Sequence, residues 1–485
     1  MAHTPFFPAW RSRLAPLKSR TAPLAAHLQA CTLSQLESRF GPWVPAHLFP
    51  KMSEKQNSRD RIYTRWRTFW CMLWQSLNPQ ASSREVVRQL QALFQLQGGP
   101  VISPVDAAYC RARGRLPLSE FPKALAATAQ AAGQRVGSLA WLGGRPLKVL
   151  DGSTLTLPDT PANRAAYPPV QCPALGFPML RIVVLFSLFS GAILTLAQGN
   201  LLTSELALLT GLLSQLTPRD IVVGDRGFGN FVVVALPHNL QVDFIGRTNR
   251  RVDGRQRTRR LGKNDWLMVW RKGAQPSPWL TPAQWAALPQ ELTVRAVRGS
   301  LYQTGFRSRQ VTVITTLLDP ELYPAQEILQ AYLRRWRLEM CLDDLKTTLQ
   351  LEMLRSHSPA MAQKEVYVRL IGHNLIRCLM AQAANRHDVM MERLSFKGAL
   401  DALRQFSQAV CQSRSQKQRR KLWEALLKTL ATDLAPERPG RREPRAVKRR
   451  KHKYPRLRGP RRQFHDHPKR HTRRANARLR KLGLM

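Results

Sequence analysis

The chain has 485 residues, of which 44% are hydrophobic and 8% aromatic, and its 76 lysines and arginines outnumber its 31 acidic residues, giving a net charge of +45. This apolar content is sufficient for packed cores and excludes a wholly disordered basic protein. The positive charge predicts a polyanionic partner, either nucleic acid or an anionic membrane surface.

The sequence favours nucleic acid over a membrane. The most apolar stretch, Ile182 to Ala197, is shorter than the roughly 20 residues of a spanning helix and is interrupted by Ser190-Gly191. The N-terminus lacks the basic region and apolar run of a secretory signal, which favours a cytoplasmic protein. The 7 cysteines include no Cys-x-x-Cys pair, so we expect reduced, mostly buried thiols.

Residues 1–140 are predicted to form a helical DNA-binding region. Apolar residues at helical spacing predict a helix from Arg84 to Leu96, and Ser103 is a candidate N-cap for a second helix from Pro104 to Arg115. Arg111 and Arg115 are four residues apart and therefore share a face of that second helix. The pair could enter a DNA groove as a helix-turn-helix does, or present a solvated basic face, and the pattern does not choose between the two.

From Pro146 the pattern changes to strands and predicts an α/β fold with a mixed sheet flanked by helices. Leu147 to Leu150 leads into Asp151, and Asp220 to Gly224 is a short apolar strand that ends at Asp225. Between them we predict a strand hairpin, Met179–Ser190 and Ala192–Gln198, and a helix, Ser204–Leu216. After Asp225 we predict a further helix and strand at about 226–246.

Residues 248–318 are basic and strand-like, and they look inserted between two parts of the sheet domain. Trp266 and Trp270 would share one face of a strand in this insertion. A long helix is predicted from Pro324 to Gln350, and a second, amphipathic helix from Gln363 to Ala384. The last 45 residues, 441–485, carry a net charge of +17 and few large apolar residues, so we expect a basic disordered tail.

Three carboxylates and a basic stripe are the candidate site residues. Asp151 and Asp225 end strands that can lie side by side, and Glu339 on a covering helix could complete a triad of oxygen ligands for Mg²⁺ or Mn²⁺. At about 100° per residue, Tyr332, Arg335, Glu339 and Lys346 fall within roughly 60° of arc, beside the apolar face of their helix. Alternatively, the aspartates cap turns before glycine and the stripe is a solvated ion-pair network.

These residues resemble the DDE transposases of the insertion-sequence-four family. The resemblance is carried by Asp151-Gly152-Ser153, by Asp225-Arg226-Gly227-Phe228 and by the spacing Y-x2-R-x3-E-x6-K from Tyr332 to Lys346. It extends from about Gln80 to Ala384. It implies a ribonuclease-H-like catalytic core, interrupted by a β-rich insertion, that performs cut-and-paste transposition through a DNA hairpin.

The resemblance also implies roles for individual residues. Asp151, Asp225 and Glu339 would be catalytic and would bind Mg²⁺, with Mn²⁺ as a substitute. Tyr332, Arg335 and Lys346 would contact phosphates near the cleaved end, and we group Arg226 with them. An aromatic residue of the insertion would stack on a flipped base, so Trp266 and Trp270 are candidates, with core packing as the alternative.

The resemblance therefore implies a DDE transposase that binds the element ends and target DNA as double-stranded DNA, and that works as a homodimer in a synaptic complex. Two alternatives stay open: a metal-dependent nuclease without transposition, and a catalytically decayed DNA-binding protein. The predicted organisation begins with a helical DNA-binding region, 1–140. The catalytic core follows in two parts, 141–247 and 319–390, on either side of the insertion, 248–318. The chain then continues with a helical C-terminal region, 391–440, and the tail, 441–485.

Overall fold

The computed structural model describes residues 40–50, 62–96, 101–136, 141–169, 176–248, 257–301, 309–413 and 415–435. Within these ranges the side chains of residues 96, 301, 309, 336–339, 408 and 411–412 are outside the description. The predicted basic tail, 441–485, lies outside the described residues. Among the helices that are described, none has both the length and the apolar character needed to cross a membrane.

Helices make up the first described part of the chain, as predicted. They are α3 (Arg65–Leu77), α4 (Ser83–Leu96), α5 (Ala107–Arg115) and α6 (Glu120–Gly133). The prediction that Ser103 caps α5 is wrong, because the helix begins at Ala107 and Asp106 is its N-cap. The Ser103 hydroxyl instead accepts a hydrogen bond from the amide of Val105, which holds the turn before the helix.

A mixed sheet of nine strands runs through the described part of the chain, in the order β3-β2-β1-β4-β5-β9-β8-β7-β6. The pairs β1–β4 and β4–β5 are parallel, and every other neighbouring pair is antiparallel. The strands are β1 (Leu147–Thr156), β2 (Met179–Ser187), β3 (Ile193–Asn200), β4 (Ile221–Gly224), β5 (Asp243–Arg247), β6 (Arg257–Gly262), β7 (Asp265–Arg271), β8 (Glu291–Leu301) and β9 (Arg309–Thr315).

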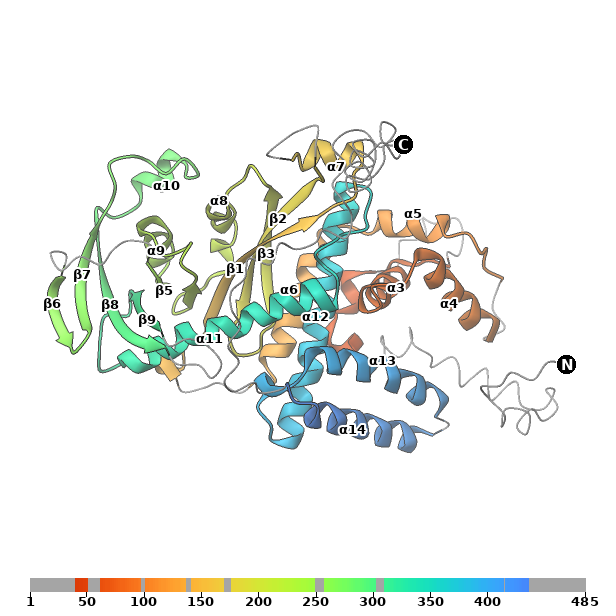
Figure 1. Ribbon diagram of the computed structural model, residues 1–485. Helices are drawn as coiled ribbons and strands as arrows, with labels where there is room; N and C mark the ends of the chain where they lie inside the picture. Colours follow the sequence, from red (N-terminus) through yellow and green to blue (C-terminus); the bar gives the residue numbers. More distant parts are fainter. Residues whose placement is uncertain are drawn as a thin grey trace, which may run out of the picture.

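The strands of the predicted insertion extend this sheet and do not form a second one. β9 pairs with β5 through Ile245 and Thr315, and β8, β7 and β6 follow outward from it. Figure 1 shows these strands at the left end of the molecule, continuous with the central strands. The predicted β-rich character of 248–318 is therefore confirmed for its described residues.

Helices cover both faces of the sheet, which confirms the predicted layering. Alternate residues of β1 point to opposite faces, so that Val149 packs with α11 and α12 while Leu150 packs with α8 and α9. The remaining helices are α7 (Pro161–Ala166), α8 (Glu205–Thr210), α9 (Phe231–His238), α10 (Pro282–Ala286), α11 (Ala325–Asp343), α12 (Pro359–His387), α13 (Phe396–Gln412) and α14 (Gln416–Thr432).

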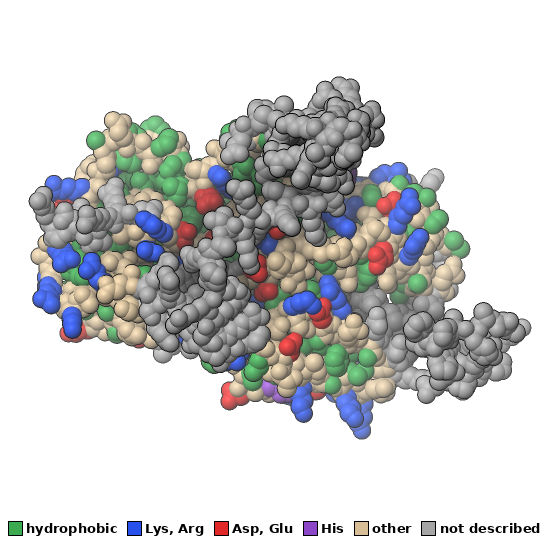
Figure 2. All heavy atoms as spheres, in the orientation of Figure 1, with side chains coloured by type: hydrophobic (Ala, Val, Ile, Leu, Met, Phe, Trp, Pro, Cys, Tyr) green, Lys and Arg blue, Asp and Glu red, His purple; other side chains and the backbone are tan. Residues whose placement is uncertain are grey.

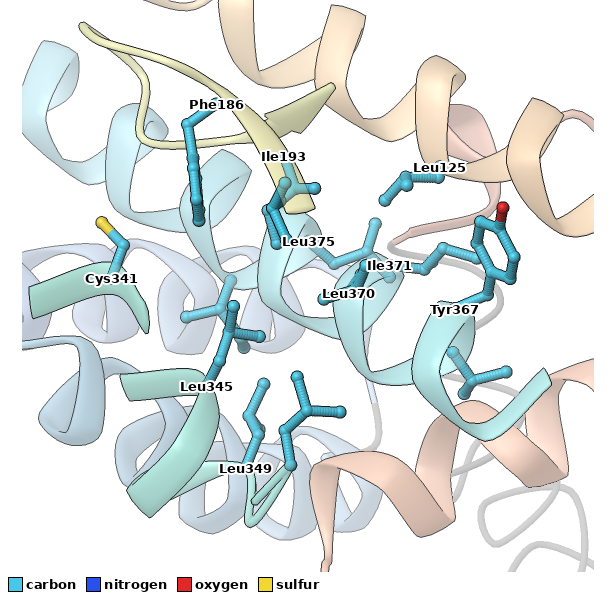
Figure 3. Close-up of a cluster of buried hydrophobic side chains, with 14 of the residues drawn as sticks. Leu125, Phe186, Ile193, Cys341, Leu345, Leu349, Tyr367, Leu370, Ile371 and Leu375 are labelled. Carbon is cyan, nitrogen blue, oxygen red and sulfur yellow. The ribbon is translucent and has the colours of Figure 1, made fainter. Parts of the chain in front are cut away.

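Helix α12 forms the centre of the larger core. It packs against α3, α6, α13 and α14, and most of its side chains from Val366 to Ala384 are buried. Figure 3 shows Ile371 and Leu375 of α12 among side chains of α6 and of the β2–β3 hairpin. The predicted second amphipathic helix is therefore longer than expected and buried around most of its circumference.

Candidate active site

The register of two parallel strands brings Asp151 and Asp225 together. β1 pairs with β4 from Leu147 opposite Ile221 to Val149 opposite Val223. Two residues further along each chain, this register places Asp151 beside Asp225. The prediction that the two strands are neighbours is confirmed, and the placement of the two aspartates follows from continuing their register past its last pair.

Asp151 does not end its strand, and this part of the prediction is wrong. β1 continues to Thr156 because Asp151 and the following residues pair with β2, in which Asp151 lies opposite Val184. Its Oδ1 accepts a hydrogen bond from the amide of Gly152 at 2.8 Å. β4 ends at Gly224, and on that side of β1 Thr156 forms a parallel bridge with Met353.

Asp225 lies in the turn that follows β4. Its Oδ1 accepts hydrogen bonds from the amides of Gly227 at 2.7 Å and Phe228 at 3.3 Å. The turn-capping role that was open for this aspartate is therefore observed. These bonds engage one oxygen and fix the direction of the carboxylate, which leaves its Oδ2 as a potential ligand.

Helix α11 places Tyr332 and Arg335 on the face of the sheet to which Val149 points. Tyr332 is 3% exposed and Arg335 is 6% exposed, so the alternative of a solvated stripe is wrong for these two residues. The Arg335 guanidinium carbon lies 5.6 Å from the centroid of the Tyr332 ring. Burial raises the pKa of the Tyr332 hydroxyl, while the neighbouring arginines Arg335 and Arg247 oppose that rise, and Asp225 is close enough to add to it.

The third predicted carboxylate, Glu339, belongs to α11, but its side chain is outside the described residues. The helix itself is shorter than predicted. It ends at Asp343, and a π-helical turn from Asp344 to Thr348 follows, closed by a hydrogen bond from the amide of Leu349 to the carbonyl of Asp344 at 3.0 Å. Lys346 lies in this turn and is half-buried, so a wheel of about 100° per residue does not describe its position.

Asp151 and Asp225 offer carboxylate oxygens, which suit a hard divalent cation, and at least one oxygen of Asp225 lies outside the turn's hydrogen bonds. Among the described residues, no group of three or more His, Cys, Asp or Glu side chains is arranged to hold a metal ion. A complete site therefore requires a ligand beyond these two, and Glu339 of α11 is the ligand that the sequence predicts.

Sequence reasoning missed Glu205, whose carboxylate lies against the backbone of Gly152. A Cβ atom added to Gly152 would lie 2.7 Å from Cδ of Glu205, so the side chain occupies the space that a larger residue at 152 would need. Glu205 is the first residue of α8, and an acid there is common because it suits the helix dipole. Only the missing side chain of Gly152, beside Asp151, could have drawn attention to this position.

The predicted DNA-contacting residues differ in accessibility. Arg226 is exposed in the turn after β4. Arg111 and Arg115 are exposed on α5 and line a cavity of about 300 Å³ together with Ile62, Tyr63, Ile102, Ser103 and Ala108.

Trp266 and Trp270 share a face of β7, as predicted, but both are buried. Trp266 is 5% exposed and Trp270 is 3% exposed, and both belong to the core cluster beneath α9. The Arg257 guanidinium lies over the Trp266 ring, 4.2 Å from its centroid. Core packing, the alternative to base stacking, is therefore their role in this structure.

The chain is similar to several known proteins. A family model described as a transposase DDE domain matches residues 142–375. The transposase InsG for insertion sequence element IS4, from Escherichia coli (strain K12), is 26% identical over 326 residues, which cover 65% of this chain and 69% of that protein. A solved structure of the piggyBac transposase synaptic complex with hairpin DNA has a TM-score of 0.40 and 12% identity, covering 84% of this chain and 85% of that one.

Proposed function

Because the chain carries a transposase DDE domain and is a distant homologue of the IS4 transposase InsG, we propose that it catalyses cut-and-paste transposition of an insertion sequence. The observation that carries the proposal is the parallel register that sets Asp151 beside Asp225, under a helix that bears Glu339. The strand order β3-β2-β1-β4-β5, with three antiparallel strands followed by two parallel ones, supports a ribonuclease-H-like core.

Asp151, Asp225 and Glu339 are the proposed ligands of Mg²⁺, for which Mn²⁺ can substitute. When bound, a pair of such ions would supply Lewis-acid activation of the attacking oxygen and stabilisation of the leaving oxygen in phosphodiester cleavage. The protein contributes the geometry. Strand β1 and the turn after β4 carry the two aspartates, and hydrogen bonds from two backbone amides to Oδ1 of Asp225 orient its carboxylate.

Tyr332 and Arg335 are proposed to hold a phosphate of the cleaved strand. Arginine offers a planar set of donors that matches phosphate oxygens, and burial strengthens such charge-assisted bonds. A tyrosine hydroxyl carries its proton at neutral pH, and the raised pKa of Tyr332 reinforces this, so it can donate to a phosphate oxygen. Lys346, in the π turn, would add a further positive charge near the same strand.

The positive charge on strands β6–β8 supports double-stranded DNA as the partner. Several arginines on these strands are exposed, and the two acidic side chains among them, Asp265 and Glu291, are each paired with an arginine of the same sheet. The exposed arginines are Arg257, Arg259, Arg260 and Arg298. We further propose assembly as a homodimer on the two element ends and retain the domain boundaries given above.

The direct test is incubation of the protein with a labelled duplex that contains the DNA flanking its own gene, with and without Mg²⁺ or Mn²⁺, beside a Glu339→Gln variant. Metal-dependent nicks and hairpins at the element boundary, absent from the variant, are the expected result. Cleavage without strand transfer or end specificity would indicate a nuclease instead. Binding without cleavage in any metal would indicate a decayed DNA-binding protein.

A further inference from the structure

Helix α14 is fixed to the body of the protein along one side. Leu426, Leu427 and Leu430 are buried in the core that surrounds α12, and Trp423 packs against that core. The helix begins after Ser415, whose hydroxyl accepts a hydrogen bond from the amide of Gln418. Its remaining surface is therefore presented in a fixed orientation.

The exposed side of α14 carries a basic stripe, which we define as Lys417, Arg420, Lys421 and Lys428. All four side chains are exposed. At about 100° per residue they fall within roughly 100° of arc, and the buried leucines lie on the adjoining sector. At about 1.5 Å per residue, the stripe from Lys417 to Lys428 is about 17 Å long. Figure 2 shows Lys and Arg side chains along the lower margin of the molecule, where Figure 1 places α14.

One acidic residue lies within the stripe, and it is paired with a cation. Glu424 falls between Arg420 and Lys421 around the helix, and its carboxylate lies 3.2 Å from Nε of Arg386, at the end of α12. Arg386 itself is exposed, so its positive charge offsets the negative charge of Glu424 on the same surface. The acid therefore does not cancel the charge of the stripe, as an unpaired glutamate would.

We propose that the basic stripe of α14 binds the phosphate backbone of double-stranded DNA, as a surface separate from the candidate active site. Duplex DNA carries one negative charge per about 1.7 Å of its axis, so a rigid row about 17 Å long spans about five base pairs of phosphates. Lysine and arginine side chains bind such phosphates without reading the sequence. The choice of DNA as the polyanion rests on the proposed function.

A pair of matched triple variants tests this surface in the full chain. The first replaces three residues of the stripe: Lys417→Gln, Lys421→Gln and Lys428→Gln. The second removes the same charge from three ion-paired cations elsewhere: Lys123→Gln, Arg164→Gln and Lys397→Gln. Equilibrium binding to a random-sequence duplex is measured from 50 to 300 mM salt, with circular dichroism to confirm equal folding.

The slope of log affinity against log salt changes by about 0.9 for each phosphate that the protein no longer neutralises. We therefore expect the slope of the stripe variant to fall by about 2 to 3 units and its affinity at 150 mM salt to fall about tenfold or more, while the slope of the control variant changes by less than one unit. Equal slopes for the two variants, or a wild-type slope for the stripe variant, would overturn the proposal.

A second arm separates DNA from an anionic membrane. Binding to phosphatidylserine vesicles that is abolished in the stripe variant, with DNA binding intact, would overturn the proposal in favour of a lipid surface. Since these measurements do not require cleavage, they stand even if the protein cuts no DNA. If the wild-type protein cleaves DNA but the stripe variant keeps the wild-type salt slope, the result counts against the stripe alone.

Discussion

Arg295 and Asp265 form a buried ion pair with two hydrogen bonds, from Nε to Oδ1 at 2.9 Å and from Nη2 to Oδ2 at 2.5 Å. Arg295 is 0% exposed, and its Nη1 also donates to the carbonyl of Tyr323 at 2.8 Å. Tyr323 immediately precedes Pro324, the N-cap of α11. A pair located on β7 and β8 is thus bonded to the segment that starts the helix of Glu339.

Replacing Arg295 with leucine is expected to destabilise the protein strongly, because it leaves the Asp265 carboxylate buried without a partner. Breaking a buried pair in this way costs about 3–5 kcal/mol. The measurement is the free energy of unfolding in urea. The control is Arg271→Leu, which removes the exposed ion pair with Glu291 and should change stability by about 1 kcal/mol or less. Similar losses for both variants would contradict this role for Arg295.

Gly229 is expected to tolerate no side chain. A Cβ atom at this position would lie 1.9 Å from the carbonyl oxygen of Arg247, and a backbone atom cannot rotate away as a side chain can. Gly229→Ala should therefore cost about 2 kcal/mol or more through overpacking.

The distortion from Gly229→Ala would also reach the turn that holds Asp225, so metal-dependent cleavage should fall as well. Gly273→Ala, where an added Cβ meets nothing within 4 Å, is the control and should behave as wild type. A wild-type melting temperature for Gly229→Ala would show that the backbone at Arg247 can move aside.

Asp344 is expected to make stability fall as the pH rises. Burial raises the pKa of this carboxyl from 3.8 to about 7, with Arg377 opposing the rise. Between those values the unfolded chain releases the proton and the folded protein keeps it, so the free energy of unfolding declines with pH across this window and changes no further above about 7.

Asp344→Asn should remove the decline and be more stable than wild type at pH 8, by up to about 1.4 kcal/mol for each unit of pKa shift. Denaturant unfolding at pH 5, 6, 7 and 8 measures the effect. Asp343→Asn should make the decline smaller without removing it, because the charge of Asp343 adds to the rise in the pKa of Asp344. If the wild-type protein were more stable than Asp344→Asn at pH 8, the charged carboxylate of Asp344 would be paired in the folded protein.

The π turn that contains Asp344 also marks a limit of sequence reasoning. Leu345 and Leu349 are both buried, and their apolar spacing is compatible with a continuing α-helix, so it does not reveal the π turn. The sequence pattern places Asp151 at a strand end, but pairing with β2 keeps this segment extended. Local patterns do not contain such pairings.

Short apolar runs were easier to interpret. The run at β4, Ile221 to Gly224, is buried on both faces, as expected of a central parallel strand, and it located Asp225 correctly. The continuity of the sheet from β5 into β9 depends on residues about 70 positions apart, such as Ile245 and Thr315, and no local pattern specifies it. Likewise, alternation placed Trp266 on a strand face but could not show that this face is covered.

Arg335 is expected to act on DNA cleavage more than on DNA binding. Arg335→Lys keeps the charge but loses the planar set of donors, and one charge-assisted hydrogen bond is worth about 1.5–3 kcal/mol, or about 10- to 100-fold in rate. Affinity for duplex DNA should change by less than about threefold, because many other cations contribute to it. Single-turnover cleavage and equilibrium binding on the same duplex separate the two effects.

Arg334 provides the matched control, since it precedes Arg335 on α11 but lies over the Trp141 ring, 4.8 Å from its centroid, and pairs with Glu392. Arg334→Lys should cleave within about threefold of wild type, because lysine retains the charge and the cation–π contact. If both variants showed the same drop in cleavage, the effect would belong to the packing of α11. If Arg335→Lys cleaved at the wild-type rate, the guanidinium would not contact the phosphate in the rate-limiting step.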